Sequence, residues 1–251
     1  MINYNPIPTL NLGPITLHTW GIAVAISFLL AMILIHKKAK KEGLEKNFSE
    51  SKTIDLLLIA IISGFIGARL LYAIEYGFQD FFIIWRGGLS WYGGLLLGTI
   101  AIVSYIKIKN IPFRYLELIA LFLPISFAIA RIGCFLNWDN YGLPTNLPWG
   151  VKVGNDLPRH PNQIYESLSS ILIFFILFYI DKKQQDKKIK KVRKDKLILV
   201  PLFLFSYSLV RFLLDFLRDS PRYFDLTLAQ WISLAIMITL FINFIIKKFI
   251  K

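Results

Sequence analysis

Long apolar runs, separated by short polar or basic segments, cover most of the chain. Seven of them approach the roughly 20 residues that an α-helix needs to cross a bilayer. They occupy residues 16–35, 53–75, 89–106, 113–134, 163–180, 197–217 and 228–246. The pattern predicts an all-α integral membrane protein, a single polytopic membrane domain over residues 1–251 with seven transmembrane helices. Residues 135–162 form a polar loop region between the fourth and fifth runs.

The distribution of basic residues predicts the orientation of the helices. Of the 29 lysines and arginines, 21 lie in the connections after the first, third and fifth runs and in the C-terminal tail. Because basic loops mark the cytoplasmic side, we expect the N-terminus outside, the C-terminus in the cytoplasm and a small external cap formed by loops. The first run lacks a basic segment before it and a cleavage site after it, so we expect a retained helix.

Composition agrees with the membrane class and limits the possible functions. Hydrophobic residues make up 55% of the chain, more than is usual in a water-soluble domain of this length. The net charge of +13 is explained mostly by the cytoplasmic loops, which argues against a nucleic-acid partner. A single cysteine excludes an intramolecular disulfide framework. With no zinc-ligand spacing and no phosphate-binding loop, we expect neither a metal nor a cofactor.

Arginines in the apolar runs are the first candidates for chemistry. At a helical rise of about 1.5 Å per residue, Arg69, Arg131 and Arg211 lie roughly 20–27 Å from the inner face, in the outer half of the bilayer. Such charges are costly in a membrane, and a shared polar cavity would explain them. Snorkelling to the headgroups or pairing inside the bundle are the structural alternatives.

The sixth run carries a stripe of polar side chains. Tyr207, Arg211, Asp215 and Arg218 follow one another at i, i+4, i+8 and i+11, which places them on one helix face. Arg211 and Asp215 are able to form a purely structural local pair. A second arginine and a tyrosine on the same stripe favour an anionic ligand instead.

Further polar residues stand at the outer ends of other runs. Arg69 and Tyr72 form a donor pair, and Tyr92 lies among glycines that suit either ligand approach or helix packing. Gln163 and Glu166 begin the fifth run. An interfacial position accounts equally well for Tyr92, and the helix dipole alone favours Glu166.

Taken in order, these segments resemble the bacterial prolipoprotein diacylglyceryl transferase family. The resemblance rests on LHTWG, GARLLY, GGLSWYGG, RIGCFLNWDNYG, PWGV, RHPNQIYES, SYSLVRFLLDFLR and LTLAQ. It implies an enzyme of the cytoplasmic (inner) membrane whose active site faces the outer leaflet. Its partners would be the lipid bilayer, phosphatidylglycerol and lipobox-containing preproteins. Its reaction would transfer a diacylglyceryl group from the lipid to the lipobox cysteine thiol, as the first step of lipoprotein maturation.

The resemblance also implies roles for individual residues. Arg131 would bind the lipid phosphate, and Arg211, held by Tyr207 and Asp215, would stabilise the leaving phosphate. Three residues match the family signature around Arg131: Gly133, Asn137 and Gly142. The cavity or its entrances would be lined by Arg69, Tyr72, Gln163, Glu166 and Arg218.

Three positions depart from the family pattern. Tyr92 replaces the histidine suspected of accepting the thiol proton, Cys134 replaces an asparagine, and Asp139 replaces a glutamate. Tyr92 would serve as a base only if neighbouring arginines favoured its phenolate, and Cys134 is interpreted as a small buried filler. Two alternatives therefore stand beside the transferase: a relative that moves another lipid onto cysteine, and a non-enzymatic lipid-binding or translocating protein.

Overall fold

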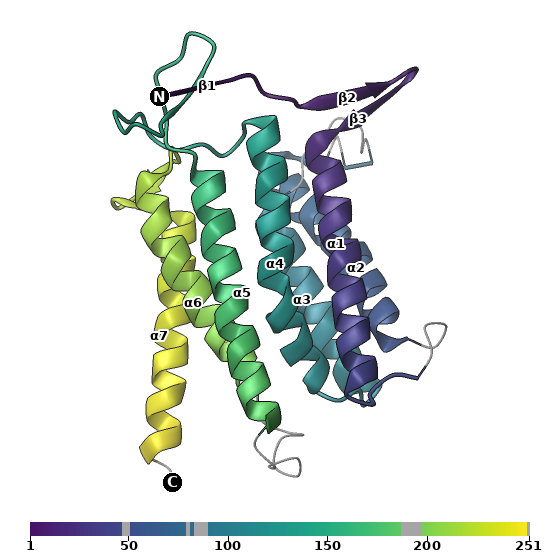
Figure 1. Ribbon diagram of the computed structural model, residues 1–251. Coiled ribbons are helices and arrows are strands. Elements are labelled where there is room, and N and C mark those ends of the chain that lie inside the picture. Colours follow the sequence, from purple (N-terminus) through teal and green to yellow (C-terminus); the bar gives the residue numbers. More distant parts are fainter. Residues whose placement is uncertain (47–50, 79–80, 83–89, 187–196, 250–251) are drawn as a thin grey trace. The chain divides into compact units, whose positions relative to one another are not determined.

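Helices account for most of the regular structure in the computed structural model, which describes residues 1–46, 51–78, 81–82, 90–186 and 197–249 (Figure 1). Within these residues the α-helices are α1 (Thr19–Lys41), α2 (Lys52–Tyr76), α3 (Trp91–Ile108), α4 (Arg114–Asn137), α5 (Asn162–Asp186), α6 (Leu199–Leu214) and α7 (Leu228–Phe249). A 3₁₀ turn, η3 (Asp215–Leu217), continues α6.

Length and apolar composition identify six of these helices as candidate membrane spans. They are α1, α2, α4, α5, α6 with its η3 extension, and α7. In α3, the apolar stretch Gly93–Ile108 is shorter than the others. The prediction of a multi-pass, all-α membrane protein is thus confirmed, while the count of seven spans stays a prediction.

Helix ends differ from the predicted runs where polar residues continue a helix. The first run was expected to end near residue 35, but α1 continues to Lys41, and α5 continues to Asp186. Lysine and glutamine propagate a helix nearly as well as leucine, so the helical hydrogen bonds extend beyond the apolar run. Apolar length therefore locates a helix in the chain better than it locates the helix end.

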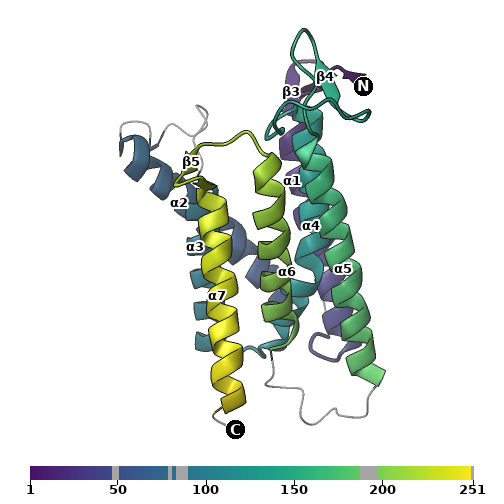
Figure 2. The ribbon, with the colours of Figure 1, turned by 90° about the vertical axis from the view of Figure 1, so that its left-hand side faces the viewer.

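The described residues form two compact units. Unit 1 comprises Met1–Ala31 and Leu116–Lys251, and unit 2 comprises Met32–Tyr115. In unit 1, α6 packs against both α5 and α7 (Figures 1 and 2). In unit 2, α2 and α3 pack closely, and the absence of side chains at Gly67 and Gly93 makes this possible. A Cβ on either glycine would collide with the backbone of the other. Gly67 and Gly93 thus serve helix packing.

A carboxylate on α4 replaces the missing cap of α6. The residue before α6, Ile198, has no side chain that can accept a hydrogen bond from the first turn. Glu117, 4% exposed, instead accepts from the backbone N–H groups of Ile198, Leu199 and Val200 at 2.9–3.0 Å. These are donors that a helix start leaves without intrahelical partners. The contact joins the beginning of α4 to the beginning of α6.

Short strands gather at one end of unit 1. β1 (Ile2–Tyr4) pairs in parallel with β4 (Val151–Val153), and in Figure 1 this pair lies at the end where α4 stops and α5 begins. The remaining strands form two antiparallel ladders: β2 (Thr9–Leu12) with β3 (Ile15–His18), and β5 (Arg222–Tyr223) with β6 (Leu226–Thr227). The polar cluster described next combines residues of α4, α5 and α6 with residues of the loops that follow α4 and η3.

Candidate functional site

Glu166, on the first turns of α5, is the centre of a cluster of cations in unit 1. Its carboxylate forms ion pairs with Arg131 of α4, with Arg211 of α6 at 2.5 Å, and with Arg218 after η3 at 3.4 Å. Glu166 is 8% exposed, so the interaction is largely removed from water. Two segments far apart in sequence, Arg131 on one and Arg211 with Arg218 on the other, therefore deliver guanidinium groups to one buried carboxylate.

Asp215 pairs with one of these arginines. Arg211 forms an ion pair with Asp215, four residues on, with 3.0 Å between the charged atoms, so the local pair anticipated from the sequence is present. Asp215 is 1% exposed and also accepts a hydrogen bond from the Thr227 hydroxyl. Because Arg211 contacts Glu166 as well, the local pair holds the arginine in place without neutralising the whole cluster.

The loop after α4 extends the cluster by hydrogen bonds. Asn140, in a left-handed backbone conformation with φ 59°, accepts from Arg218 and donates to Asp139 at 2.6 Å. Asn137 donates to the other carboxylate oxygen of Asp139 at 2.9 Å. Gln163 then donates to the backbone carbonyl of Asp139 at 2.5 Å. These bonds return to α5 one helical turn before Glu166, and we call the set Glu166, Arg218, Asn140, Asp139 and Gln163 the polar ring.

Both signature glycines lie where a side chain would not fit. A Cβ on Gly133 would collide with Ala23 of α1. A Cβ on Gly142 would come within 2.6 Å of the Leu217 carbonyl and 2.7 Å of His160 Cβ. Gly142 also forms an isolated β-bridge with Arg218. The glycine at this position therefore lets the loop approach the chain segment that carries Arg218.

His160 and Tyr165 form a separate group at the start of α5. Trp149 donates its indole N–H to the Tyr165 hydroxyl at 2.8 Å, and that hydroxyl lies 3.3 Å from His160 Nδ1. Burial lowers the pKa of His160 below its usual range, so the imidazole is neutral near pH 7. The Tyr165 hydroxyl, which accepts from Trp149, keeps its own proton to donate to Nδ1 of a neutral His160.

Tyr207 packs against aromatic side chains, and Cys134 lies beside Arg131. The Tyr207 ring packs against Phe127 at 5.4 Å and Phe203 at 5.7 Å between centroids. Cys134 is 4% exposed, with its sulfur 3.8 Å from an Arg131 nitrogen. The thiol is thus a buried neighbour of Arg131.

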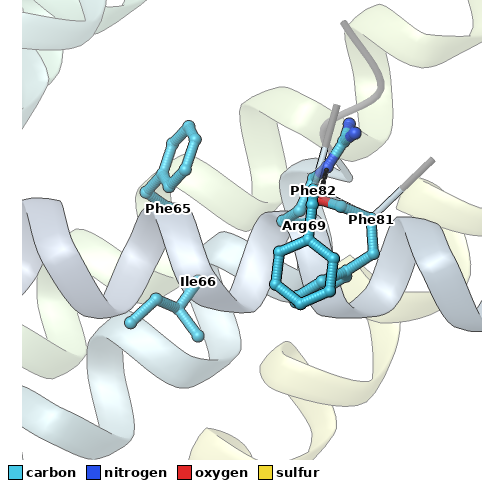
Figure 3. Close-up of a pocket in the computed structure, with 5 residues that line it drawn as sticks. All are labelled: Phe65, Ile66, Arg69, Phe81 and Phe82. Carbon is cyan, nitrogen blue, oxygen red and sulfur yellow. Dashed lines mark hydrogen bonds between the residues drawn. The ribbon is translucent and has the colours of Figure 1, made fainter. Parts of the chain in front are cut away.

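The predicted residues of unit 2 form a different environment. Arg69, 3% exposed, donates from Nε to the Phe81 carbonyl at 2.9 Å and lies 5.7 Å from the centre of the Tyr72 ring. A small pocket beside it is lined by Phe65, Ile66, Arg69, Phe81 and Phe82, and Figure 3 shows the arginine bonded to the Phe81 backbone. The backbone of Tyr92 lies in the first turn of α3, and its side chain lies outside the described residues.

Charge balance in unit 1 indicates what the cluster is able to bind. Three guanidinium groups, those of Arg131, Arg211 and Arg218, contact the single carboxylate of Glu166 and therefore outnumber it, while Asp215 pairs with Arg211. Burial, and then the neighbouring Arg211 cation, lower the pKa of Arg218. Guanidinium groups present several donors in a planar fork that suits carboxylate and phosphate oxygens. The arrangement fits an anion with several oxygen atoms.

Asn140 and Thr227 are cluster residues that sequence reasoning did not select. Asn140 contacts Arg218, which lies 78 residues away, and Thr227 contacts Asp215 from the far side of the β5–β6 turn. Asn140 stands next to Asp139 in a polar stretch, which was the available signal. Thr227 lies in the LTLAQ segment, but nothing in the sequence marked it as a partner of Asp215.

Comparison with known proteins identifies the family. The family model described as prolipoprotein diacylglyceryl transferase matches residues 8–246. Phosphatidylglycerol–prolipoprotein diacylglyceryl transferases of Vibrio vulnificus (strain YJ016) and Pasteurella multocida (strain Pm70) are each 32% identical to this chain. These matches cover 86% of this chain and 82% of the Vibrio protein, and 89% of this chain and 83% of the Pasteurella protein. The enzyme of Bordetella avium (strain 197N) is 27% identical over 94% of this chain and 91% of its own length. The chain therefore belongs to the prolipoprotein diacylglyceryl transferase family.

Proposed function

We propose that this chain transfers the diacylglyceryl group of phosphatidylglycerol to the lipobox cysteine thiol of prolipoproteins. The observation that carries the proposal is the convergence of Arg131, Arg211 and Arg218 on the single carboxylate of Glu166. The relatives reported above are named for this reaction. An anionic phospholipid supplies the multi-oxygen anion that the excess of guanidinium groups favours.

The proposed topology places this cluster at the outer leaflet of the cytoplasmic (inner) membrane. All seven helices cross the bilayer as one polytopic domain, with the N-terminus outside, the C-terminus inside and residues 135–162 in an external cap. The distribution of lysine and arginine supports this orientation. A lipid then reaches the arginines laterally from the outer leaflet, and the preprotein cysteine reaches them from the same side.

In the proposed reaction, the thiolate of the substrate cysteine attacks the glycerol carbon that bears the phosphate ester. A carbon–sulfur bond forms, the carbon–oxygen bond breaks, and glycerol phosphate leaves with the electron pair. Arg131 binds the phosphate of the incoming lipid, and Arg211, held by Asp215 and packed beside Tyr207, stabilises the charge that grows on the leaving phosphate. The lipid phosphate takes over guanidinium contacts that Glu166 holds in the free protein.

The remaining assignments rest on the resemblance to the family. Gly133, Asn137 and Gly142 shape the phosphate site, Arg69 and Tyr72 are further lipid contacts, and Tyr92 accepts the thiol proton. Tyr92→Phe removes the phenolic oxygen and should abolish turnover while leaving lipid binding intact. Turnover equal to that of the unmodified protein would exclude Tyr92 as the base.

The decisive experiment is a transfer assay with purified protein in proteoliposomes. Phosphatidylglycerol and a lipobox peptide should yield a peptide with a diacylglyceryl thioether, detected by mass spectrometry. Parallel vesicles with other headgroups separate this activity from transfer of a different lipid. Binding of both substrates without any thioether product would instead identify a non-enzymatic lipid-binding protein.

A further inference from the structure

The side chain of Gln163, next to the arginine cluster, carries a buried hydrogen-bond acceptor, Oε1, for which the described residues supply no donor. Its side chain is 1% exposed, and its Oε1 finds no hydrogen-bond donor among the residues that the structure describes. The adjacent Asn162, also 1% exposed, has an Oδ1 in the same situation. Buried polar atoms are nearly always satisfied in folded proteins, so an acceptor of this kind points to a ligand donor.

The orientation of the Gln163 amide follows from its one fixed bond. Nε2 donates to the backbone carbonyl of Asp139 at 2.5 Å. Reversing the amide would bring two acceptor oxygens together, so the assignment of nitrogen to this position is physically determined. Oε1 therefore lies on the side of the amide away from Asp139.

The polar ring places this acceptor beside the phosphate-binding arginines. From Glu166 the ring passes through Arg218, Asn140 and Asp139 to Gln163, with each link a hydrogen bond or an ion pair. Gln163 and Glu166 are three residues apart on α5, and residues at this spacing share a helix face about 4.5 Å apart along the axis. An anion held by the arginines is thus about one helical turn from the amide.

We propose that Gln163 Oε1 accepts a hydrogen bond from a hydroxyl of the lipid headgroup and selects phosphatidylglycerol over anionic lipids whose headgroup lacks that donor. The inference rests on the proposed function. Arginines are donors only and recognise the phosphate, which every anionic phospholipid shares. A headgroup glycerol adds hydroxyl donors, and a buried amide oxygen is the matching acceptor. Gln163 thus supplies the part of recognition that charge does not.

The test compares two lipids of equal charge, phosphatidylglycerol and phosphatidylpropanol, whose headgroup lacks both hydroxyls. With the unmodified protein, kcat/KM for transfer to a lipobox peptide should be about tenfold lower with phosphatidylpropanol, the value of one neutral hydrogen bond. Gln163→Met removes the acceptor at similar volume, and its kcat/KM values for the two lipids should be nearly equal. A purely structural glutamine would lower both values and leave their ratio unchanged.

Gln230→Met is the matched control. Gln230 is 0% exposed and is satisfied at both ends, since Oε1 accepts from the Thr227 N–H and Nε2 donates to the Phe212 carbonyl. Its replacement should lower the thermal unfolding temperature yet keep the tenfold lipid preference.

Equal transfer from both lipids by the unmodified protein would overturn the inference and leave the transferase assignment intact. Absence of any transfer from phosphatidylglycerol would overturn the proposed function itself. An unchanged lipid preference in folded Gln163→Met would also overturn the inference.

Discussion

Two buried glutamates, one in each unit, show how differently a carboxylate can be satisfied. In unit 2, Glu45 is 6% exposed and accepts from Ser51 Oγ, the Thr53 N–H and Oγ1 and the Tyr115 hydroxyl, and its carboxylate also contacts His36 Nδ1. In unit 1, Glu166 is 8% exposed and is surrounded by guanidinium groups.

The difference lies in the charge of the donors. Hydroxyl and backbone N–H donors satisfy the carboxylate oxygens of Glu45 locally, and these donors carry no charge that could bind a further anion. The guanidinium groups around Glu166 carry more positive charge than this carboxylate neutralises, and each keeps donors for other oxygen atoms. Glu45 and Glu166 are therefore similarly buried, but Glu45 stabilises the local structure, whereas Glu166, in our proposal, belongs to a ligand site.

The largest expected effect tests the ligand role of the unit 1 arginines. Arg131→Ala and Arg211→Ala should each lower kcat for diacylglyceryl transfer by about 10²–10³-fold, because each removes a donor that stabilises charge on the leaving phosphate. The matched control is Arg114→Ala in unit 2, whose guanidinium pairs with Glu42 at 2.7 Å. If Arg131→Ala and Arg211→Ala transferred the lipid about as fast as Arg114→Ala, the arginines of unit 1 would have no special role in the reaction.

Replacing each glutamate by glutamine should separate the two roles. Glu45→Gln should lower the free energy of unfolding by about 1–3 kcal/mol, since buried donors lose a charged acceptor, and should leave transfer per folded molecule unchanged. Glu166→Gln removes the anion that competes with the lipid phosphate, so KM for phosphatidylglycerol should fall. The product phosphate should also bind more tightly and reduce kcat. Steady-state kinetics measures KM and kcat, and denaturant unfolding measures the free energy of unfolding. If Glu45→Gln and Glu166→Gln changed these quantities in the same way, the two glutamates would not have different roles.

The pH dependence of stability should report the Glu45 network. Burial raises the pKa of Glu45, but hydrogen bonds from Thr53, Ser51 and Tyr115 outweigh burial and lower it below its ordinary value of 4.5. A carboxylate with a lowered folded pKa contributes stability above its unfolded pKa and loses it as the pH falls through the folded value. The thermal unfolding temperature should therefore fall below about pH 4.5, and Glu45→Gln should make it depend less on pH. An unaltered acid limb in that variant would assign the effect to other groups.

The smallest effect is expected at the buried thiol beside Arg131. Cys134→Ala should keep transfer within about twofold of the unmodified protein and cost about 1 kcal/mol of stability, as for loss of a small buried side chain. Transfer rates and unfolding midpoints check both values. A loss as large as that of Arg131→Ala would give the cysteine a role in the chemistry.

Much of the fold and part of the site were predictable from local patterns. Apolar runs located the helices, because the length of an apolar segment is a property of neighbouring residues. Arg131 and Arg211 stood out because charges inside such runs are costly. The family prediction is confirmed, because the model of the family matches residues 8–246. The sequence left open whether the glycines beside Tyr92 serve ligand approach or helix packing, and the close approach of Gly93 to the backbone of Gly67 assigns Gly93 to packing.

Long-range partners were beyond the reach of local patterns. Glu166 was expected at a cavity wall, yet it is the centre on which three arginines converge. Asn140 and Thr227 join the cluster through bonds spanning 78 and 12 residues, and no spacing rule reaches that far. The cap that Glu117 provides for α6 likewise spans more than 80 residues.

The sequence by itself determined that this is a helical membrane protein of the transferase family with arginines in its apolar runs. Hydrophobic length, charge and motif order are written along the chain and do not depend on which helices become neighbours. Only the tertiary structure decided which carboxylate those arginines share and which amide lies beside them. Hydrogen bonds and ion pairs act over about 3 Å, and such distances between remote residues exist only once the helices and loops have packed.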